Sequence, residues 1–398
     1  MSSKKRKILL LAVKMVVAGG LLAWVLNQAS WNDYVVTKDG KTCSIQSYDA
    51  PTKTFLVTQG KLWWRTGASV SEDQLQPIKG TNPPVFVFKG FRESIRDIRW
   101  PFIVLAMAGL LASTLIVAVR FWFLLRIQDI NIKLWEAIRL TFLGNFFNNF
   151  MPSTVGGDLV KAYYVAKHTP RKAAVLVCIF VDRILGMTEL TVLAGVMIVT
   201  VLVGKLRTFD QIEKSALMVG LVVLIVIGGM TFLLSSRFRR LFHLDKLYKR
   251  LPIAHHFEAA GDAARLFRQR FWSLVKAIGI TFGAHVVWVG AIASLGMSLT
   301  DMSGVPWYLY FINIPLIYII GAVPVSLGGV GLVEGAFIQF FAGVSPSTVL
   351  ALALLARFAP MFWSLPGLVV ALTGPKLPKA AAMEAELEAA EGREPKSE

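Results

Sequence analysis

Long apolar runs alternate with short basic segments along most of the 398-residue chain. A helix that crosses a bilayer needs about 20 predominantly apolar residues. We therefore predict six full spans, at residues 8–26, 100–125, 173–204, 215–234, 271–298 and 347–372. The segment Ala277–Pro375 is almost free of charge, since its only formal charges are Asp301, Glu334 and Arg357. This hydropathy predicts an all-α polytopic membrane protein.

The first apolar run follows four basic residues, Lys4–Lys7, an arrangement that also begins signal peptides. The run is longer than the apolar core of a signal peptide, and no small-x-small cleavage site follows it cleanly. We therefore predict that residues 1–26 form a cytoplasmic tip and an uncleaved first helix.

Residues 27–99 are more polar and alternate with the period of a β-strand. Asp39-Gly40 lies between two alternating runs, and Gln59-Gly60 lies between two more, which is typical of β-hairpins. We predict a small β-rich domain of four or five strands, followed by a short amphipathic helix that leads to Trp100. Because it is inserted between the first two spans, this domain should be extracytoplasmic.

Charge supports this topology. Hydrophobic residues make up 55% of the chain and charged residues only 17%, and the formal net charge is +17. Soluble proteins carry about 25% charged residues. The basic surplus gathers in Lys4–Lys7 and in the segments 120–172 and 235–270, and cytoplasmic loops of membrane proteins are rich in Lys and Arg. We therefore predict a cytoplasmic-membrane location with both termini inside, and we exclude nucleic acid as the partner.

Two loop segments complete the predicted topology. The loop 235–270 mixes Phe and Leu with Arg and Lys, as does a helix that lies on an anionic leaflet. A solvated linker is the alternative. The tail 373–398 is mostly acidic and rich in alanine, and we expect no catalytic domain in it.

Metal and cofactor chemistry is not indicated. Cys43 and Cys178 lie far apart, and Cys178 is within an apolar run, which excludes a disulfide framework and a CxxC metal site. The five histidines lack the spacing of a zinc site, and no nucleotide-binding glycine motif is present. We predict no cofactor and no metal.

Two further apolar segments, 132–168 and 305–342, are too interrupted to be simple spans. Each contains a proline, a nearby serine, a Gly-Gly pair and then a carboxylate, which is Asp158 in the first segment and Glu334 in the second. Proline breaks a helix and Gly-Gly permits a tight reversal. A break at membrane depth is tolerated where the freed backbone is buried in protein or lines a polar cavity.

The two segments enter from opposite faces of the predicted topology, because 132–168 is flanked by cytoplasmic charges and 305–342 lies between the fifth and sixth spans. Paired interrupted segments of this kind are typical of re-entrant hairpins in an inverted repeat, with a central site. Ordinary loops or kinked spans remain the alternative, since Pro and Gly are common in membrane helices.

A few charges lie inside the predicted membrane region. Asp182 and Arg183 are neighbours on one helix and point about 100° apart, so each should find a partner elsewhere. The planar fork of Arg183 suits a carboxylate or a phosphate, and its structural alternative is an ion pair with Asp158 or Glu334. Intramembrane ionisable residues indicate function by default.

Other polar residues have equally plain structural readings. Lys161 follows Asp158 at i+3 and could pair with it on one helix face. Glu334 either caps the second helix of its hairpin or handles protons or headgroups. His285, in an apolar span, is expected to be a packed core residue.

Three ordered motifs resemble the lysylphosphatidylglycerol synthase transmembrane region, a flippase-like family. They are Asn148–Asp158, the Asp182-Arg183-x-x-Gly186 sequence and Pro324-x-Ser-x-Gly-Gly-x-Gly-x-x-Glu334. The resemblance covers about residues 100–372. It implies a polytopic lipid translocator with two re-entrant hairpins. At the third position after GGD this family commonly has Arg, whereas this chain has Lys161, which keeps the charge and loses the bidentate fork.

We therefore predict a lipid flippase that moves phospho-, aminoacyl-phospho- or polyprenyl-linked lipids between leaflets. Arg183 would bind the headgroup between two hairpin tips, Asp182 would position a partner or carry protons, and rocking of one repeat would alternate access. The residues that we expect to bind substrate are Asn149, Pro152, Ser153, Gly156, Gly157, Asp158, Lys161, Asp182, Arg183, Pro324, Ser326, Gly328, Gly329, Glu334 and Arg357.

Two other functions are kept as alternatives. A membrane-embedded glycosyl or lipid-phosphate transferase would need paired carboxylates or metal ligands, and Asp158 and Glu334 lie on different hairpins. The resemblance does not extend to an aminoacyl-transferase domain, so lysyl transfer is not expected. A non-transporting assembly partner would use the 27–99 domain to contact an envelope protein.

Overall fold

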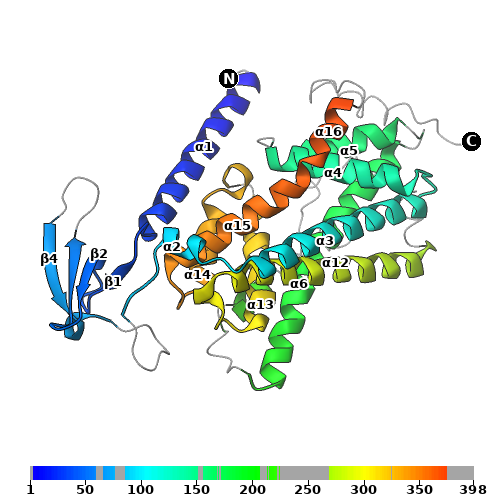
Figure 1. Ribbon diagram of the computed structural model, residues 1–398. Helices are drawn as coiled ribbons and strands as arrows, with labels where there is room; N and C mark the ends of the chain where they lie inside the picture. Colours follow the sequence, from blue (N-terminus) through cyan, green and yellow to red (C-terminus); the bar gives the residue numbers. More distant parts are fainter. Residues whose placement is uncertain are drawn as a thin grey trace, which may run out of the picture. The chain divides into compact units, whose positions relative to one another are not determined.

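The computed structural model describes residues 3–59, 66–76, 86–150, 156–167, 169, 172–206, 213, 215–221, 224, 269–323 and 325–373. They belong to two compact units, each described by itself below (Figure 1). The first unit lies within Met1–Ala106, Ile292–Pro306 and Val323–Phe358. The second lies within Met107–Ala291, Trp307–Ala322 and Ala359–Glu398.

The fold is mostly helical. Four helical stretches of the described chain are long and apolar enough to cross a membrane: Trp100–Ile127, Ala174–Val203, Trp272–Ser298 and Pro346–Thr373. They coincide with four of the six predicted spans. The first predicted span lies in helix α1 (Ser3–Gln28), whose apolar part Val13–Gln28 is shorter, and the span 215–234 and the loop 235–270 fall mostly outside the described residues. These helices are consistent with the predicted polytopic membrane protein.

Four strands of the first unit form one antiparallel sheet in the order β1-β2-β3-β4 (Figure 1). The strands are Tyr34–Val36, Thr42–Asp49, Thr54–Gln59 and Thr66–Ser71. Gly40 makes the predicted first turn in the left-handed region, with φ 78°, where glycine has no steric cost. Alternate side chains from the strands, among them Val35, Cys43 and Val57, form a small buried core.

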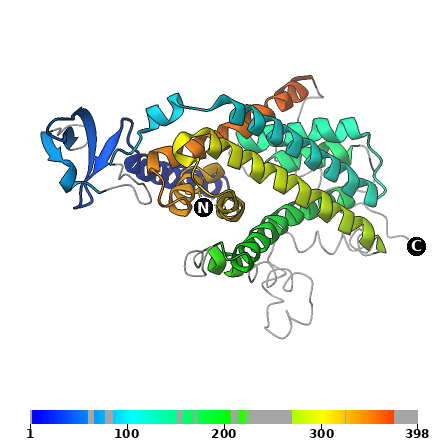
Figure 2. The ribbon, with the colours of Figure 1, turned by 60° about the horizontal axis from the view of Figure 1, so that its bottom comes forward.

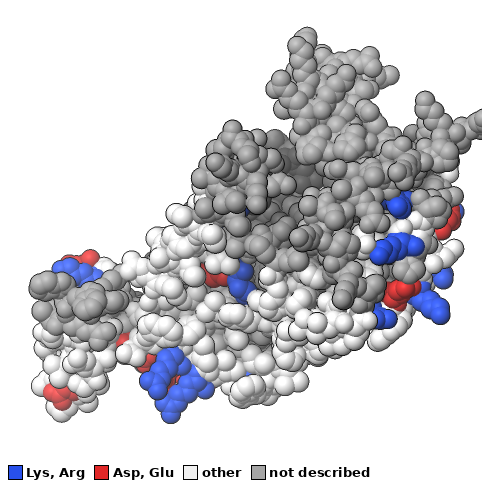
Figure 3. Space-filling view, turned by 90° about the horizontal axis from the view of Figure 1, so that it is seen from above, with Lys and Arg blue, Asp and Glu red and all other residues white. Residues whose placement is uncertain are grey.

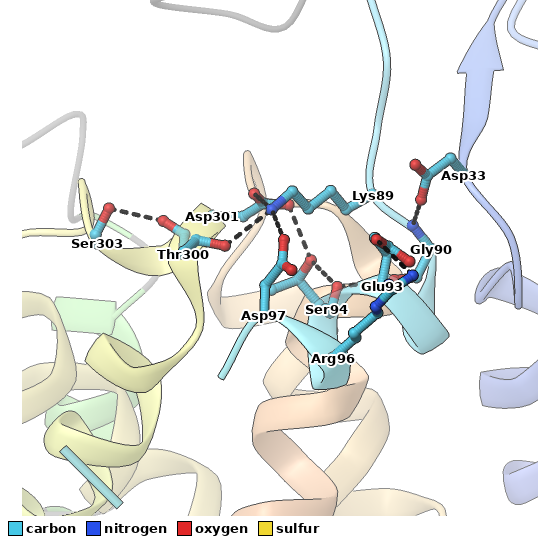
Figure 4. A network of polar contacts seen from close by, with 11 residues as sticks. Asp33, Lys89, Gly90, Glu93, Ser94, Arg96, Asp97, Thr300, Asp301 and Ser303 are labelled. Atoms are coloured by element: carbon cyan, nitrogen blue, oxygen red, sulfur yellow. Dashed lines mark hydrogen bonds and ion pairs between the residues drawn. The ribbon is translucent and has the colours of Figure 1, made fainter. Parts of the chain in front are cut away.

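Polar contacts hold the segment after the sheet against two other parts of the first unit (Figure 4). The Lys89 ammonium donates to Asp97 at 2.8 Å and to Thr300 at 2.9 Å, and lies 3.8 Å from Asp301. Thr348, in the first turn of α15 (Pro346–Ser364), donates to Asp301 at 3.3 Å. We call this network the Lys89 junction. It joins the short helix α2 (Phe91–Arg96), the 3-10 turn Thr300–Met302 and α15.

The second unit is built on long helices. Its core comes from α3 (Trp100–Ile127), α4 (Leu134–Phe150), α5 (Gly156–Ala166) and α6 (Lys172–Val203). Helix α12 (Phe271–Ser298) runs beside α3 (Figure 2), and Ser113 of α3 donates to the carbonyl of Ala284 at 3.0 Å. Helix α13 (Trp307–Gly321) packs against α6, and α16 (Pro366–Thr373) packs against α4.

Much of the described surface is uncharged, as a chain of membrane helices requires. In Figure 3 the charged side chains gather in a few clusters, separated by surface that carries no charge. Large apolar side chains on the candidate spans are exposed, among them Val104, Val199 and Phe358. A soluble protein would bury such helix faces, whereas lipid can cover them.

Candidate functional site

Each interrupted segment is a pair of helices on either side of a break. In the first, α4 ends at Phe150 and α5 begins at Gly156, and the two helices pack against each other. In the second, a 3-10 turn (Leu327–Gly329) precedes α14 (Leu332–Phe340). Residues 151–155, where the first motif predicts its break, and Pro324 of the second motif lie outside the described residues. The separate helices on either side of each motif agree with the predicted interruptions, and re-entry into a membrane remains a prediction.

Glycines bring α4 and α5 into close contact. A Cβ on Gly157 would overlap the carbonyl oxygen of Gly144, and a Cβ on Gly144 would overlap the side chain of Lys161. The N–H of Gly157 donates to the Asn148 side chain at 2.9 Å, which satisfies one donor at the start of α5. Gly157, the second residue of the Gly-Gly pair in the first motif, thus has a packing role.

Two ion pairs connect α6 to its neighbours in the second unit. Arg183 donates from Nε to the carboxylate of Asp158, in the first turn of α5. Asp182 accepts from Nε of Arg120 in α3 at 2.7 Å. Asp182 and Arg183 thus turn to different helices, as predicted from their 100° separation. The structural alternative for Arg183, an ion pair with Asp158, is confirmed.

Lys161 does not take part in these pairs. Its residue is 5% exposed, its methylenes lie against Gly144, and its ammonium is 5.2 Å from the ring centroid of Phe121. Asp158 pairs with Arg183, and no ion pair joins it to Lys161 in the described chain. The i+3 pairing considered for these two residues is therefore not formed.

The second motif is closed by Glu334 and Arg357. The N–H of Gly331, the residue before α14, donates to Oε2 of Glu334 at 2.7 Å. Nε of Arg357 in α15 donates to Oε1 of Glu334 at 2.5 Å. The remaining guanidinium nitrogens donate to the carbonyls of Gly328 (3.2 Å) and Gly329 (3.3 Å). Glu334 therefore caps α14, and Arg357 binds backbone carbonyls that the break leaves without helical partners.

Helix α1 covers this break within the first unit. Gly331 has φ 78°, and a Cβ there would overlap Leu21 of α1. A Cβ on Gly335 would lie 2.9 Å from the ring of Trp24. Ser326, 3% exposed, has a buried Oγ that makes no hydrogen bond to any described residue. The Gly-rich motif therefore allows α1 to lie directly on the start of α14.

The two breaks are closed by the same kind of pair. In each, a carboxylate in the first turn after the break binds an arginine of the next long helix, 25 residues later for Asp158 and 23 residues later for Glu334. The pairs differ in exposure. The side chains of Arg183 and Asp158 are 43% and 13% exposed, whereas those of Arg357 and Glu334 are 23% and 2% exposed.

Some predicted site residues do not join these clusters. Asn149 is exposed near the end of α4. Pro152, Ser153 and Pro324 lie outside the described residues. Gly156 is the first residue of α5 and is half-buried.

Sequence reasoning missed the partner of Asp182. Arg120 was assigned to a basic cytoplasmic segment, although it lies within the predicted span 100–125. Its position inside an apolar run was the available signal. The described residues contain no group of three His, Cys, Asp or Glu side chains that could hold a metal ion.

A comparison with protein families finds one match. The model of the family described as "Lysylphosphatidylglycerol synthase TM region" matches residues 85–367, well over half of the chain. No curated protein and no solved structure matches the chain at a significant level.

Proposed function

Because the chain belongs to the lysylphosphatidylglycerol synthase TM region family, as its motifs suggested, we propose that it moves polar-headed lipids between the two leaflets of a membrane. The four candidate spans and the family support a membrane-embedded, lipid-related role. The lipid class proposed is anionic or aminoacylated phospholipid, or a polyprenyl-linked lipid, in the cytoplasmic membrane.

One observation carries this proposal: the Asp158–Arg183 pair lies at the start of α5, and the side chain of Arg183 is 43% exposed. A charged pair inside an apolar helix bundle is costly, and such residues usually mark a substrate pathway. The Glu334–Arg357 pair is more enclosed and saturated by backbone contacts. Of the two equivalent arginines, Arg183 is therefore the one that we assign to the headgroup.

The chemistry is an exchange of anions at one guanidinium. Without lipid, the Asp158 carboxylate neutralises Arg183, so that no isolated charge lies in the apolar region. A headgroup phosphate can take over part of the same planar fork, because arginine binds phosphate and carboxylate with the same geometry. The guanidinium then replaces hydrogen bonds that water makes to the headgroup at the membrane surface. This lowers the free-energy barrier for moving the headgroup across the bilayer.

Reconstituted vesicles test the proposal. Fluorescent phosphatidylglycerol, lysyl-phosphatidylglycerol and a zwitterionic lipid are placed in one leaflet, and a membrane-impermeant quencher reports transfer. Charge-assisted hydrogen bonds contribute about 1.5–3 kcal/mol, so Arg183→Ala should slow transfer of the anionic lipid about tenfold or more.

Two control variants make this test specific. Arg183→Lys keeps the charge and should retain part of the activity. Arg139→Ala removes an exposed arginine of α4 and should transfer lipid at the wild-type rate. Equal transfer by wild type and Arg183→Ala would refute the proposal.

A further inference from the structure

Helix α6 carries a third ionisable side chain, Glu189, which is buried and which the proposed function does not use. Glu189 is 4% exposed and follows Asp182 by seven residues, so the two carboxylates lie on the same face of the helix. In the described part of the chain, Glu189 makes no hydrogen bond and no ion pair. The charged group that faces it is the guanidinium of Arg120, which is bonded to Asp182.

The charges around Glu189 do not balance. Arg183 is paired with Asp158, and Arg120 is paired with Asp182. The guanidinium of Arg120 thus faces two carboxylates, those of Asp182 and Glu189, and is bonded to Asp182. An ionised Glu189 would therefore be a buried anion without a counter-ion of its own. In a medium of low dielectric constant, an isolated carboxylate avoids this cost by taking up a proton.

The other titratable groups near Asp182 are the buried thiol of Cys178 on α6 and His285 of α12. The ring of His285 interacts electrostatically with Arg120 and Asp182. The backbone of Thr281, one turn earlier, lies close to the ring. The Nδ1 atom is buried and makes no hydrogen bond to the described residues. Of the other helices packed on α6, α13 carries no charged residue. Helix α5 carries Asp158, which is paired with Arg183, and Lys161, whose ammonium lies 5.2 Å from the ring centroid of Phe121.

We infer that Glu189 is a proton-binding site within the membrane region, and that its protonation is coupled to the Arg120–Asp182 ion pair. While Arg120 binds Asp182, the Glu189 carboxylate holds one proton taken from water and is neutral. When Glu189 releases that proton to water, its carboxylate competes with Asp182 for the same guanidinium. A metal ion is a poorer occupant, because hard cations take several oxygen ligands and no cluster of three possible ligands exists in the described chain.

This site is next to the proposed headgroup residue, since Asp182 precedes Arg183. As a coupling device it rests on the proposed function: a change in the partner of Asp182 would alter the same turn of α6 that presents Arg183. As a proton site it stands on burial and charge alone. The two statements can therefore fail separately.

Infrared spectroscopy of the purified full chain in detergent tests the proton site. Wild type should show the C=O stretching band of a carboxylic acid at neutral pH, and Glu189→Gln should lose it. The matched control Glu136→Gln, at the start of α4, should keep it. Asp182→Asn frees Arg120 for Glu189 and should also lose the band, although Glu189 is still present. A structural role alone would not produce that loss.

Three results would overturn the inference: an unchanged band in Glu189→Gln, a band that persists in Asp182→Asn, or a band that disappears on adding Na⁺ at constant pH. Vesicles with an imposed pH difference then test the coupling. One transported proton gives at most about a tenfold bias per pH unit, which wild type should approach and Glu189→Gln should lack. Expected bands without any lipid transfer would refute the proposed function alone, whereas transfer with unchanged bands would refute the proton site alone.

Discussion

Removal of Arg357 should destabilise the first unit more than removal of its partner Glu334. Glu334 is 2% exposed at its side chain, so Arg357→Met leaves a buried carboxylate without its counter-ion. The variant also removes the donors to the carbonyls of Gly328 and Gly329. Breaking one side of a buried ion pair costs about 3–5 kcal/mol.

The reverse change should be milder. In Glu334→Gln the amide oxygen can still accept the Gly331 N–H, and Arg357 keeps its two carbonyl acceptors and its 23% exposure. Hydrogen bonds to charged groups contribute about 1.5–3 kcal/mol, which sets the expected loss. The double variant contains no buried charge at this position. Its cost should therefore be lower than the sum of the two single costs by about 0.5–3 kcal/mol, the usual coupling of residues in contact.

Equilibrium unfolding in mixed detergent micelles, followed by tryptophan fluorescence, measures these free energies. Arg139→Met is the control, because Arg139 is exposed on α4 and a surface change should stay within about 0.5 kcal/mol. If Arg357→Met cost no more than this control, or if the two single costs were simply additive, Arg357 would not be the counter-ion that closes the second break.

Two further variants test the packing and the Lys89 junction. Gly157→Ala places a methyl group against the Gly144 carbonyl and should lower the free energy of unfolding by about 1–3 kcal/mol. The control Gly283→Ala has open space around the new methyl group and should not lower it. Equal unfolding midpoints for the two variants would refute the close contact between α4 and α5. Burial raises the pKa of the Asp301 carboxyl above its ordinary value of 3.8, although Lys89 and Thr348 oppose this. The folded state therefore loses stability as pH rises from 3.8 through the raised pKa, so Asp301→Asn should raise the melting temperature at neutral pH and lose this advantage below pH 3.8. A melting temperature that falls equally at both pH values would contradict this reasoning.

The features that depend on local sequence were predictable. Runs of apolar residues predicted the four helical stretches of the described chain that are long and apolar enough to cross a membrane, because helix length and hydropathy can both be read from the sequence. The Asp39-Gly40 turn and the new helix starts near Asp158 and Glu334 were also predictable, since glycine permits backbone conformations such as the positive φ of Gly40 and Gly331 without help from distant residues.

The partners of the charged residues were less predictable. Asp158 could have bound Lys161, three residues away, but its partner is Arg183, 25 residues away. The i+3 spacing favours a pair between Asp158 and Lys161, whereas the packing of α5 against α6 brings Arg183 to Asp158. Arg120 was missed for the same reason, because only the approach of α3 to α6 shows that it lies beside Asp182.

Lys161 illustrates how packing changes the meaning of a motif. The resemblance placed it where related chains commonly have Arg, which suggested a weaker phosphate clamp at that position. In the structure its methylenes fill the space that Gly144 leaves open, and its ammonium faces the ring of Phe121. The lysine is therefore better explained as part of the contact between α4 and α5, and our proposal assigns anion binding to Arg183, the more exposed cation beside the same motif.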